Sequence, residues 1–94
     1  SDYYAVDVMY FLLGNGFFVP DDISVIGFDN AGISSMVKPA LTTVGQDVSY
    51  RAKMAMQYLL KMKDSRLCSV TETVPVELII RESSSALNPR QRAL

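Results

Sequence analysis

Residues 19–30 read Val-Pro-Asp-Asp-Ile-Ser-Val-Ile-Gly-Phe-Asp-Asn and contain the clearest indication of the fold class. A turn at Pro20–Asp22 leads into residues 23–28, which are apolar except for Ser24. A short apolar run without alternation is typical of a strand covered on both faces, as in a parallel sheet. Because the run stops at Asp29, the sequence predicts a buried strand whose carboxyl end carries an acidic side chain.

A helix is predicted to precede this strand. Asp2 is expected to be its N-cap, because a carboxylate can accept hydrogen bonds from the amides of the first turn. Gly14, Asn15 and Gly16 are expected to end it. Helix, turn and buried strand form the second half of a βαβ unit, so a first strand is expected just before Ser1 and the chain is expected to be a fragment. Apolar residues that recur at steps of three and four support the helix: Tyr4, Ala5, Val8, Met9, Phe11 and Leu12.

The second half of the chain is predicted to hold a strand, a helix and a second strand. Thr42–Val44 favour a short strand, and Asp47 is a good N-cap for the helix after it. Residues 74–80 alternate in polarity, which predicts a strand with one wetter face. From Ser83 onward the chain is rich in serine and is expected to be a tail. The expected core face of the helix comprises Val48, Ala52, Ala55, Met56, Leu59 and Met62.

The composition excludes several classes of function. The 94 residues suit one small domain or part of a larger one, and a net charge of −1 without a basic stripe argues against direct nucleic-acid binding. There is no histidine, which removes His-based triads and the usual zinc sites, and the single Cys68 cannot form an internal disulfide. No apolar run approaches the length of a membrane span, and residues 1–94 are not expected to include a signal peptide. The turn carboxylates Asp21 and Asp22 are expected to be solvated. No catalytic residue, metal site or cofactor is predicted, so the chain is not expected to be an enzyme.

Asp29 and Asn30 offer the clearest binding chemistry. Ligands of open α/β sheets bind beyond the carboxyl ends of parallel strands, where Asp29 and Ser1 are both expected. A carboxylate there can accept hydrogen bonds from neighbouring hydroxyls of a sugar or ribose, and Asn30 can donate and accept. The alternative is that Asp29 and Asn30 bond only to their own backbone in a turn.

Four segments in order carry a resemblance to a known family. They are Ser1-Asp2 at the start of a helix, the stretch 16–30, Lys-Pro-Ala-Leu-Thr-Thr-Val-Gly-Gln-Asp at 38–47, and Glu-Leu-Ile-Ile-Arg-Glu-Ser-Ser at 77–84. Together they resemble the signatures of the lactose-repressor and galactose-repressor family of bacterial transcription regulators. The resemblance covers residues 1 to about 85.

The resemblance implies an α/β fold that is part of a two-lobed, periplasmic-binding-protein-like (type I) fold with parallel sheets flanked by helices. Residues 1–84 are implied to be the C-terminal portion of the effector-binding sensor domain, spanning parts of both lobes. Residues 85–94 are implied to be a flexible C-terminal tail. The chain is expected to cross between the lobes at Thr42–Val44 and to return along the strand from Val74.

The resemblance also implies the function. It is effector sensing and dimerisation in a cytoplasmic regulator of the LacI type, in which a small sugar or nucleoside-like effector binds between the lobes. Effector binding is implied to control the binding of operator DNA by an N-terminal helix-turn-helix, which residues 1–94 do not contain. The alternative is a periplasmic sugar-binding protein of a transport system, which shares the fold.

The family pattern assigns roles to individual residues. Asp29 is implied to bind effector hydroxyls, and Ser1 and Asn30 complete the expected ligand-binding set. No cofactor, metal or membrane partner is implied, and the expected partners are the effector and a second copy of the chain. The expected dimer contacts are Tyr4, Val8, Ser34, Met36 and Val37.

Overall fold

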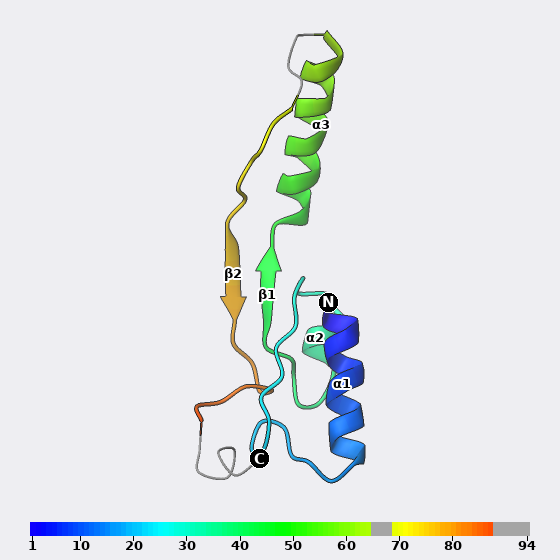
Figure 1. Ribbon diagram of the computed structural model, residues 1–94, viewed down its shortest axis with the longest axis vertical. Helices are drawn as coiled ribbons and strands as arrows, with labels where there is room; N and C mark the ends of the chain where they lie inside the picture. The colour runs from blue at the N-terminus through cyan, green and yellow to red at the C-terminus, as the bar shows by residue number, and fades with distance from the viewer. Residues whose placement is uncertain (65–68, 88–94) are drawn as a thin grey trace. The chain divides into compact units, whose positions relative to one another are not determined.

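The computed structural model describes residues 1–64 and 69–87 and is drawn in Figure 1. Cys68 and most of the predicted tail lie outside these ranges. The chain divides into two compact units, the first formed by Ser1–Gly45 with Glu77–Leu94 and the second by Gln46–Val76. Within the described ranges, no helix combines the length and apolar character needed to cross a bilayer. The elements in chain order are α1 (Asp2–Gly14), α2 (Ile33–Met36), β1 (Thr43–Gln46), α3 (Val48–Asp64) and β2 (Val76–Ile79).

Helix α1 is capped by Ser1 and not by Asp2. The Ser1 Oγ accepts a hydrogen bond from the Tyr3 amide at 3.2 Å, while Asp2 is the first helical residue and is fully buried. The prediction that Asp2 caps the helix is therefore wrong, because its carboxylate is turned inward to other partners. The helix ends at Gly14 as predicted, and Gly16 follows with a φ of +86°, a conformation that favours glycine.

Residues 23–28 pair with a later segment without forming a continuous strand. Two isolated parallel bridges join Ile26 to Thr42 and Asp29 to Gly45. Between them the Gly27 amide donates to the Thr42 carbonyl at 2.9 Å. The predicted parallel pairing is thus present, but as separate bridges.

Burial along the same segment is one-sided. Val25 and Gly27 are buried, whereas Ile26 and Phe28 are 55% and 42% exposed. The described chain therefore lacks the cover on both faces of which this apolar pattern is typical. One face packs toward the core of the first unit, and no layer of the described residues covers the other.

Strands β1 and β2 form a two-stranded sheet and run in opposite directions (Figure 1). They confirm the strands predicted near Thr42–Val44 and within 74–80. Since β1 also follows residues that form parallel bridges, the pairing around it is mixed.

The segment after β2 is fastened into the first unit. Ser83 is fully buried, and its Oγ donates to the Val25 carbonyl at 2.6 Å and accepts from the Thr42 amide at 2.8 Å. The Ser83 amide donates to the Ala40 carbonyl at 2.9 Å. The prediction that a tail begins at Ser83 is wrong, because this residue bridges two earlier segments.

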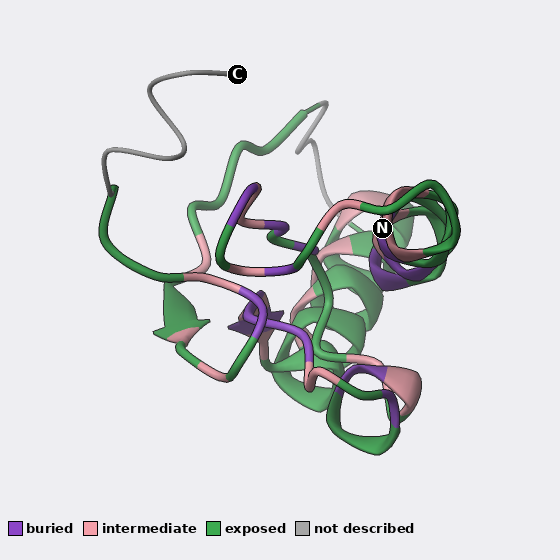
Figure 2. Cartoon of the chain, turned by 90° about the horizontal axis from the view of Figure 1, so that it is seen from below, coloured by how far each residue is buried: buried purple, intermediate pink, exposed green. Residues whose placement is uncertain are grey.

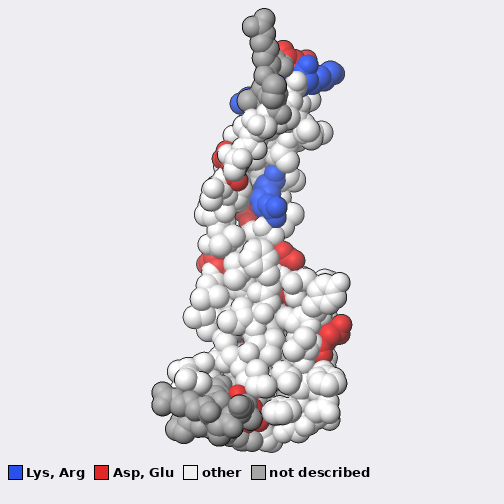
Figure 3. Space-filling view, viewed as in Figure 1, with Lys and Arg blue, Asp and Glu red and all other residues white. Residues whose placement is uncertain are grey.

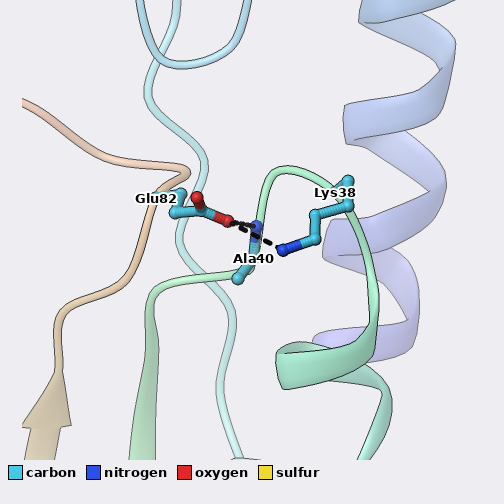
Figure 4. Close-up of polar contacts among 3 residues, drawn as sticks. All are labelled: Lys38, Ala40 and Glu82. Carbon is cyan, nitrogen blue, oxygen red and sulfur yellow. Dashed lines mark hydrogen bonds and ion pairs between the residues drawn. The ribbon is translucent and has the colours of Figure 1, made fainter.

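Glu82 adds a contact at the surface of the same segment (Figure 4). Its Oε1 accepts from the Ala40 amide at 2.8 Å and lies 3.8 Å from the Lys38 Nζ. Both charged side chains are largely exposed, so the ion pair contributes at most about 1 kcal/mol. The bond to the amide is the more specific link.

The hydrophobic core of the first unit forms between one face of α1 and the extended segments beside it (Figure 2). Met9 and Leu41 are completely buried. The other buried apolar residues are Val6, Val19, Val25 and Val37.

A buried carboxylate closes the turn before residue 23. Asp22 is 4% exposed, and its Oδ2 accepts from the Phe18 amide at 2.7 Å. The Asp22 amide donates back to the Phe18 carbonyl at 2.8 Å. The expectation of a solvated Asp22 is wrong, since this side chain satisfies the backbone of its own turn.

Helix α3 dominates the second unit. Asp47 caps it as predicted, because its Oδ1 accepts from the Tyr50 amide at 2.9 Å. No residue of α3 is buried, and Leu59 on the predicted core face is 60% exposed. This face has the apolar pattern of a core face, but too little of the described chain lies over it to bury it.

Candidate functional site

The candidate site is the corner formed by Asp29 and Asn30, at the end of the extended segment that pairs with β1. Both residues are exposed, and the Asp29 amide donates to the Val44 carbonyl at 2.8 Å. The parallel bridge between Asp29 and Gly45 places the corner beside β1. The predicted place of Asp29 beside a parallel neighbour is thus present, although the segment before it forms isolated bridges and not a strand.

The backbone of the corner is unusual. Asp29 has a φ of 116° and Asn30 a φ of 56°, and these are the positive values among the described residues other than glycine. Asn tolerates the left-handed region, but such conformations cost on the order of 1–3 kcal/mol each and persist where surrounding contacts enforce them. The contacts around the corner therefore determine its geometry.

Asp2 supplies two of these contacts from the start of α1. Its Oδ2 accepts from the Ala31 amide at 2.6 Å, and its Oδ1 accepts from the Thr43 hydroxyl at 2.6 Å. Asp2 and Thr43 are both fully buried. The carboxylate thus joins the first turn of α1, the residue after the corner and β1.

Arg81 reaches the corner from the segment after β2. Its Nη2 donates to the Asn30 Oδ1 at 2.8 Å, and its Nη1 donates to the Ser34 Oγ at 2.7 Å and to the Leu41 carbonyl at 3.0 Å. The side-chain oxygen of Asn30 is therefore bonded within the chain. Sequence reasoning did not assign Arg81 to the site, and its only signal was its place in the 77–84 segment.

Ser1 lies near the corner because the next residue, Asp2, is bonded through its backbone to Phe28. The Asp2 amide donates to the Phe28 carbonyl at 3.1 Å, next to Asp29. The Ser1 side chain is exposed but already accepts the Tyr3 amide as the helix cap. The structure thus brings Ser1, Asp29 and Asn30 to one region and gives the side chains of Ser1 and Asn30 partners inside the chain.

The predicted dimer contacts separate into two groups. Tyr4, Val8 and Met36 are 76%, 52% and 78% exposed. Ser34 and Val37 are buried. The Ser34 hydroxyl donates to the Ala31 carbonyl at 2.6 Å, and Val37 belongs to the hydrophobic core. Tyr4, Val8 and Met36 are therefore the members of the predicted set that are accessible for a dimer contact.

The second unit contains a cavity of about 570 Å³, and none of the predicted ligand-binding residues lines it. At its rim the Tyr58 hydroxyl donates to the Glu72 Oε2 at 2.8 Å. The bond to Glu72, partial burial and the nearby charges of Glu72 and Tyr50 raise the pKa of Tyr58. Most of the lining is the apolar face of α3, including Val48, Ala52, Ala55, Leu59 and Met62.

Metal-ligand groups and the distribution of charge also bear on the chemistry of the described residues. In residues 1–64 and 69–87, His, Cys, Asp and Glu side chains form no group of three that could hold a metal ion. On the face drawn in Figure 3 the charged side chains are scattered among uncharged ones. The chemistry of the Asp29–Asn30 corner is therefore that of hydrogen-bond acceptors and donors.

Comparison with known proteins identifies the family. The periplasmic binding protein-like domain family matches residues 1–84. The transcriptional repressor PurR of Vibrio campbellii is 36% identical over 89 residues, which are 94% of this chain and 27% of that protein. The chain thus spans about a quarter of the length of the curated relatives it matches.

Two solved structures agree. A LacI family transcriptional regulator from Lactobacillus casei with bound sucrose has 38% identity and a TM-score of 0.73, over 89% of this chain and 31% of that one. The lac repressor dimer bound to operator and the anti-inducer ONPF has 30% identity and a TM-score of 0.78, over 87% of this chain and 29% of that one. These matches confirm the predicted α/β class and the resemblance to lactose-repressor and galactose-repressor regulators. The chain belongs to the periplasmic binding protein-like domain family, and over part of their length it is similar to LacI-type transcription regulators.

Proposed function

We propose that this chain is the effector-sensing and dimerisation portion of a LacI-type transcription regulator acting in the cytoplasm. The effector is a small sugar or nucleoside-like molecule held between two lobes, and its binding controls operator DNA through an N-terminal helix-turn-helix. Named relatives that are transcriptional repressors support a regulator over a periplasmic transport protein. The bound sucrose of the Lactobacillus casei regulator supports a hydroxyl-rich effector.

The Asp29–Asn30 corner is the observation that carries this proposal. A carboxylate on an exposed corner, with its backbone fixed by the Asp29 amide and by the Asp2–Thr43 contacts, is suited to accept hydrogen bonds from two neighbouring hydroxyls. Asp29 is the proposed main effector contact. Ser1 and Asn30 are proposed as further effector contacts. Because the Ser1 Oγ already accepts the Tyr3 amide and the Asn30 Oδ1 already accepts from Arg81, the groups proposed are the hydroxyl proton of Ser1 and the side-chain nitrogen of Asn30.

The two units are proposed to be parts of the two lobes. The division falls between Gly45 and Gln46 and again between Val76 and Glu77, so the chain passes from one unit to the other and returns. Effector binding is proposed to favour one arrangement of the lobes over another, without making or breaking a covalent bond. A coupling of about 1–3 kcal/mol, or roughly 5–150-fold in operator affinity, is ordinary for such a switch.

Dimerisation is proposed through the exposed face of α1 and the neighbouring α2. Tyr4 and Val8 are one helical turn apart, and both are more than half exposed, as is Met36. Apolar side chains that are exposed at this spacing are suited to a protein interface. The lac repressor dimer is a neighbour in structure, which supports a second copy as the partner.

The test uses the intact regulator that contains this chain, with an operator selected from a random DNA pool. Sucrose and adenosine serve as probes for sugar and nucleoside recognition, titrated by calorimetry and in an operator-release assay. Asp29→Ala is expected to weaken binding of the active probe by roughly 10–150-fold, the range for a lost hydrogen bond to a charged group. Operator affinity without the probe is expected to stay within about twofold of wild type.

Asp21→Ala is the matched control, since it removes an exposed carboxylate from a turn outside the corner. It is expected to leave probe binding and release unchanged. An Asp29→Ala protein that responds like wild type would exclude Asp29 from the effector site.

A further inference from the structure

Arg81 connects the segment after β2 to three separate points of the first unit. Its guanidinium bonds the side chain of Asn30, the hydroxyl of Ser34 and the carbonyl of Leu41 at 2.8, 2.7 and 3.0 Å. Its own amide donates to the Thr42 Oγ1 at 2.9 Å. These partners lie 39 to 51 residues away in the chain, so the contacts are tertiary.

The shape of the guanidinium suits these partners. Arginine presents donors in a rigid planar fork, and here two nitrogens are used for acceptors on different elements. All three acceptors are neutral oxygens. The guanidinium is therefore held by the directions of its hydrogen bonds and not by an ion pair with these acceptors. A lysine ammonium lacks the fork and cannot hold Asn30 and Ser34 in the same way.

The Asn30 end of this network matters most, because the backbone there is left-handed. The Asn30 amide has only a long contact to the Thr43 Oγ1, at 3.3 Å, while its side chain is held by Arg81 at 2.8 Å. The neighbours on both sides are fixed separately, Asp29 through its amide and Ala31 through Asp2. Arg81 is therefore the contact that anchors the middle of the corner.

We propose that Arg81 is a positioning residue that anchors Asn30 and thereby sets the orientation in which the adjacent Asp29 carboxylate meets an effector. The role in effector binding rests on the proposed function, whereas the anchoring itself does not. Asn30 is then mainly a structural link between Arg81 and Asp29, and its side-chain oxygen is not an effector contact. Arg81 also links the segment that follows β2 to the corner.

Amide hydrogen exchange on the intact regulator tests the anchoring without any ligand. Arg81→Gln and Asn30→Ala are each expected to speed exchange at residues 29–31 by about tenfold, because each removes the same bond. Asn30→Asp keeps an acceptor for Arg81 and is expected to retain wild-type protection. Lys38→Gln is the matched control, since it removes a cation from the same unit at an exposed position.

Unchanged exchange at 29–31 in both Arg81→Gln and Asn30→Ala would overturn the proposal. Equal acceleration throughout the first unit, including α1, would also overturn it, because that is the result of a general loss of stability. The proposal is supported if amide exchange speeds up only at residues 29–31 in Arg81→Gln and Asn30→Ala and stays at the wild-type rate in Asn30→Asp.

A second measurement separates this proposal from the proposed function. The effect of Arg81→Gln on sucrose and adenosine binding is expected to disappear when Asp29 is already Ala, since Arg81 acts through Asp29. If Asp29→Ala leaves both probes unaffected, the effector role of the corner fails, and exchange still decides whether Arg81 anchors it. If Asp29→Ala weakens binding but Arg81→Gln changes neither exchange nor affinity, only the role of Arg81 fails.

Discussion

Gly27 lies directly against the carboxylate of Asp2. A Cβ atom at position 27 would be 2.2 Å from the Asp2 Oδ1 and 3.2 Å from the Asp2 Cα. The Asp2 side chain cannot move aside cheaply, because it is buried and bonded to Thr43 and Ala31. The close approach of the two residues therefore requires glycine.

Gly27→Ala is expected to destabilise the intact regulator by about 1–3 kcal/mol, the usual cost of forcing extra atoms into a packed site. The measurement is the urea midpoint of unfolding. Gly32→Ala is the matched control, since a Cβ there meets nothing within 4 Å and its φ is −52°. Equal midpoints for the two variants would contradict the close packing of Gly27.

Asp2→Ala is expected to cost about 3 kcal/mol, because the buried Thr43 hydroxyl and the Ala31 amide lose a charged acceptor. Asp2→Asn preserves the shape and one acceptor, so its loss is expected to be smaller. The free energy of unfolding from urea denaturation gives both values. The double variant with Thr43→Val is expected to cost less than the sum of the single variants, and strict additivity would argue against the bond.

The hydrogen bond between Tyr58 and Glu72 predicts a dependence on alkaline pH. Glu72 raises the pKa of Tyr58, so the folded protein holds this proton more tightly than the unfolded chain, whose tyrosine pKa is about 10. The stability from this bond is present below that value and is lost as pH rises through the higher pKa of the folded state.

Ultraviolet titration of tyrosinate checks this expectation. Glu72→Gln is expected to lower the pKa of Tyr58, and Tyr58→Phe is expected to remove the late-titrating group. Glu77→Gln, at an exposed position on β2, is the control and is expected to leave the titration unchanged. A curve that Glu72→Gln does not alter would remove the bond as the cause.

Substitution on the exposed face of α1 tests the proposed dimer. Tyr4→Lys with Met36→Lys is expected to convert the dimer of the intact regulator into monomers in sedimentation velocity, because each change places a charge in an apolar contact. Tyr3→Lys is the control, since Tyr3 is 62% exposed on the same helix but about a quarter turn away. A stable dimer in the double variant would place the interface elsewhere.

The elements that local sequence determines were predictable. Gly14 and Gly16 end α1 where expected, and Asp47 caps α3, because both signals act within one helical turn. The position of Asp29 at the end of an extended segment was predictable too, since an apolar run that stops at a polar residue marks it in the sequence.

The errors share a cause, which is that the deciding contacts are distant in sequence. Asp2 reads as a helix cap, but Thr43, which lies 41 residues later, takes its carboxylate into the core. Ser83 reads as the start of a tail, but it bonds Val25 and Thr42, 58 and 41 residues earlier. A polar residue near a helix start or in a serine-rich stretch carries no local mark of such a partner.

Two apolar faces that suit burial are exposed in the described chain. Ile26 and Leu59 have the pattern of buried residues, yet they are 55% and 60% exposed. Hydrophobic pattern shows that a face suits burial, but it does not show which segment covers that face.

The position of Ser83 has a consequence for synthesis on the ribosome. Helix α1 and the segment around Val25 emerge early, yet the hydroxyl that closes their core belongs to a residue made after the whole of the second unit. The Val25 carbonyl therefore lacks this partner until Ser83 has been synthesised, 58 residues later. A nascent chain stalled before residue 83 would present this unfinished core to chaperones and proteases.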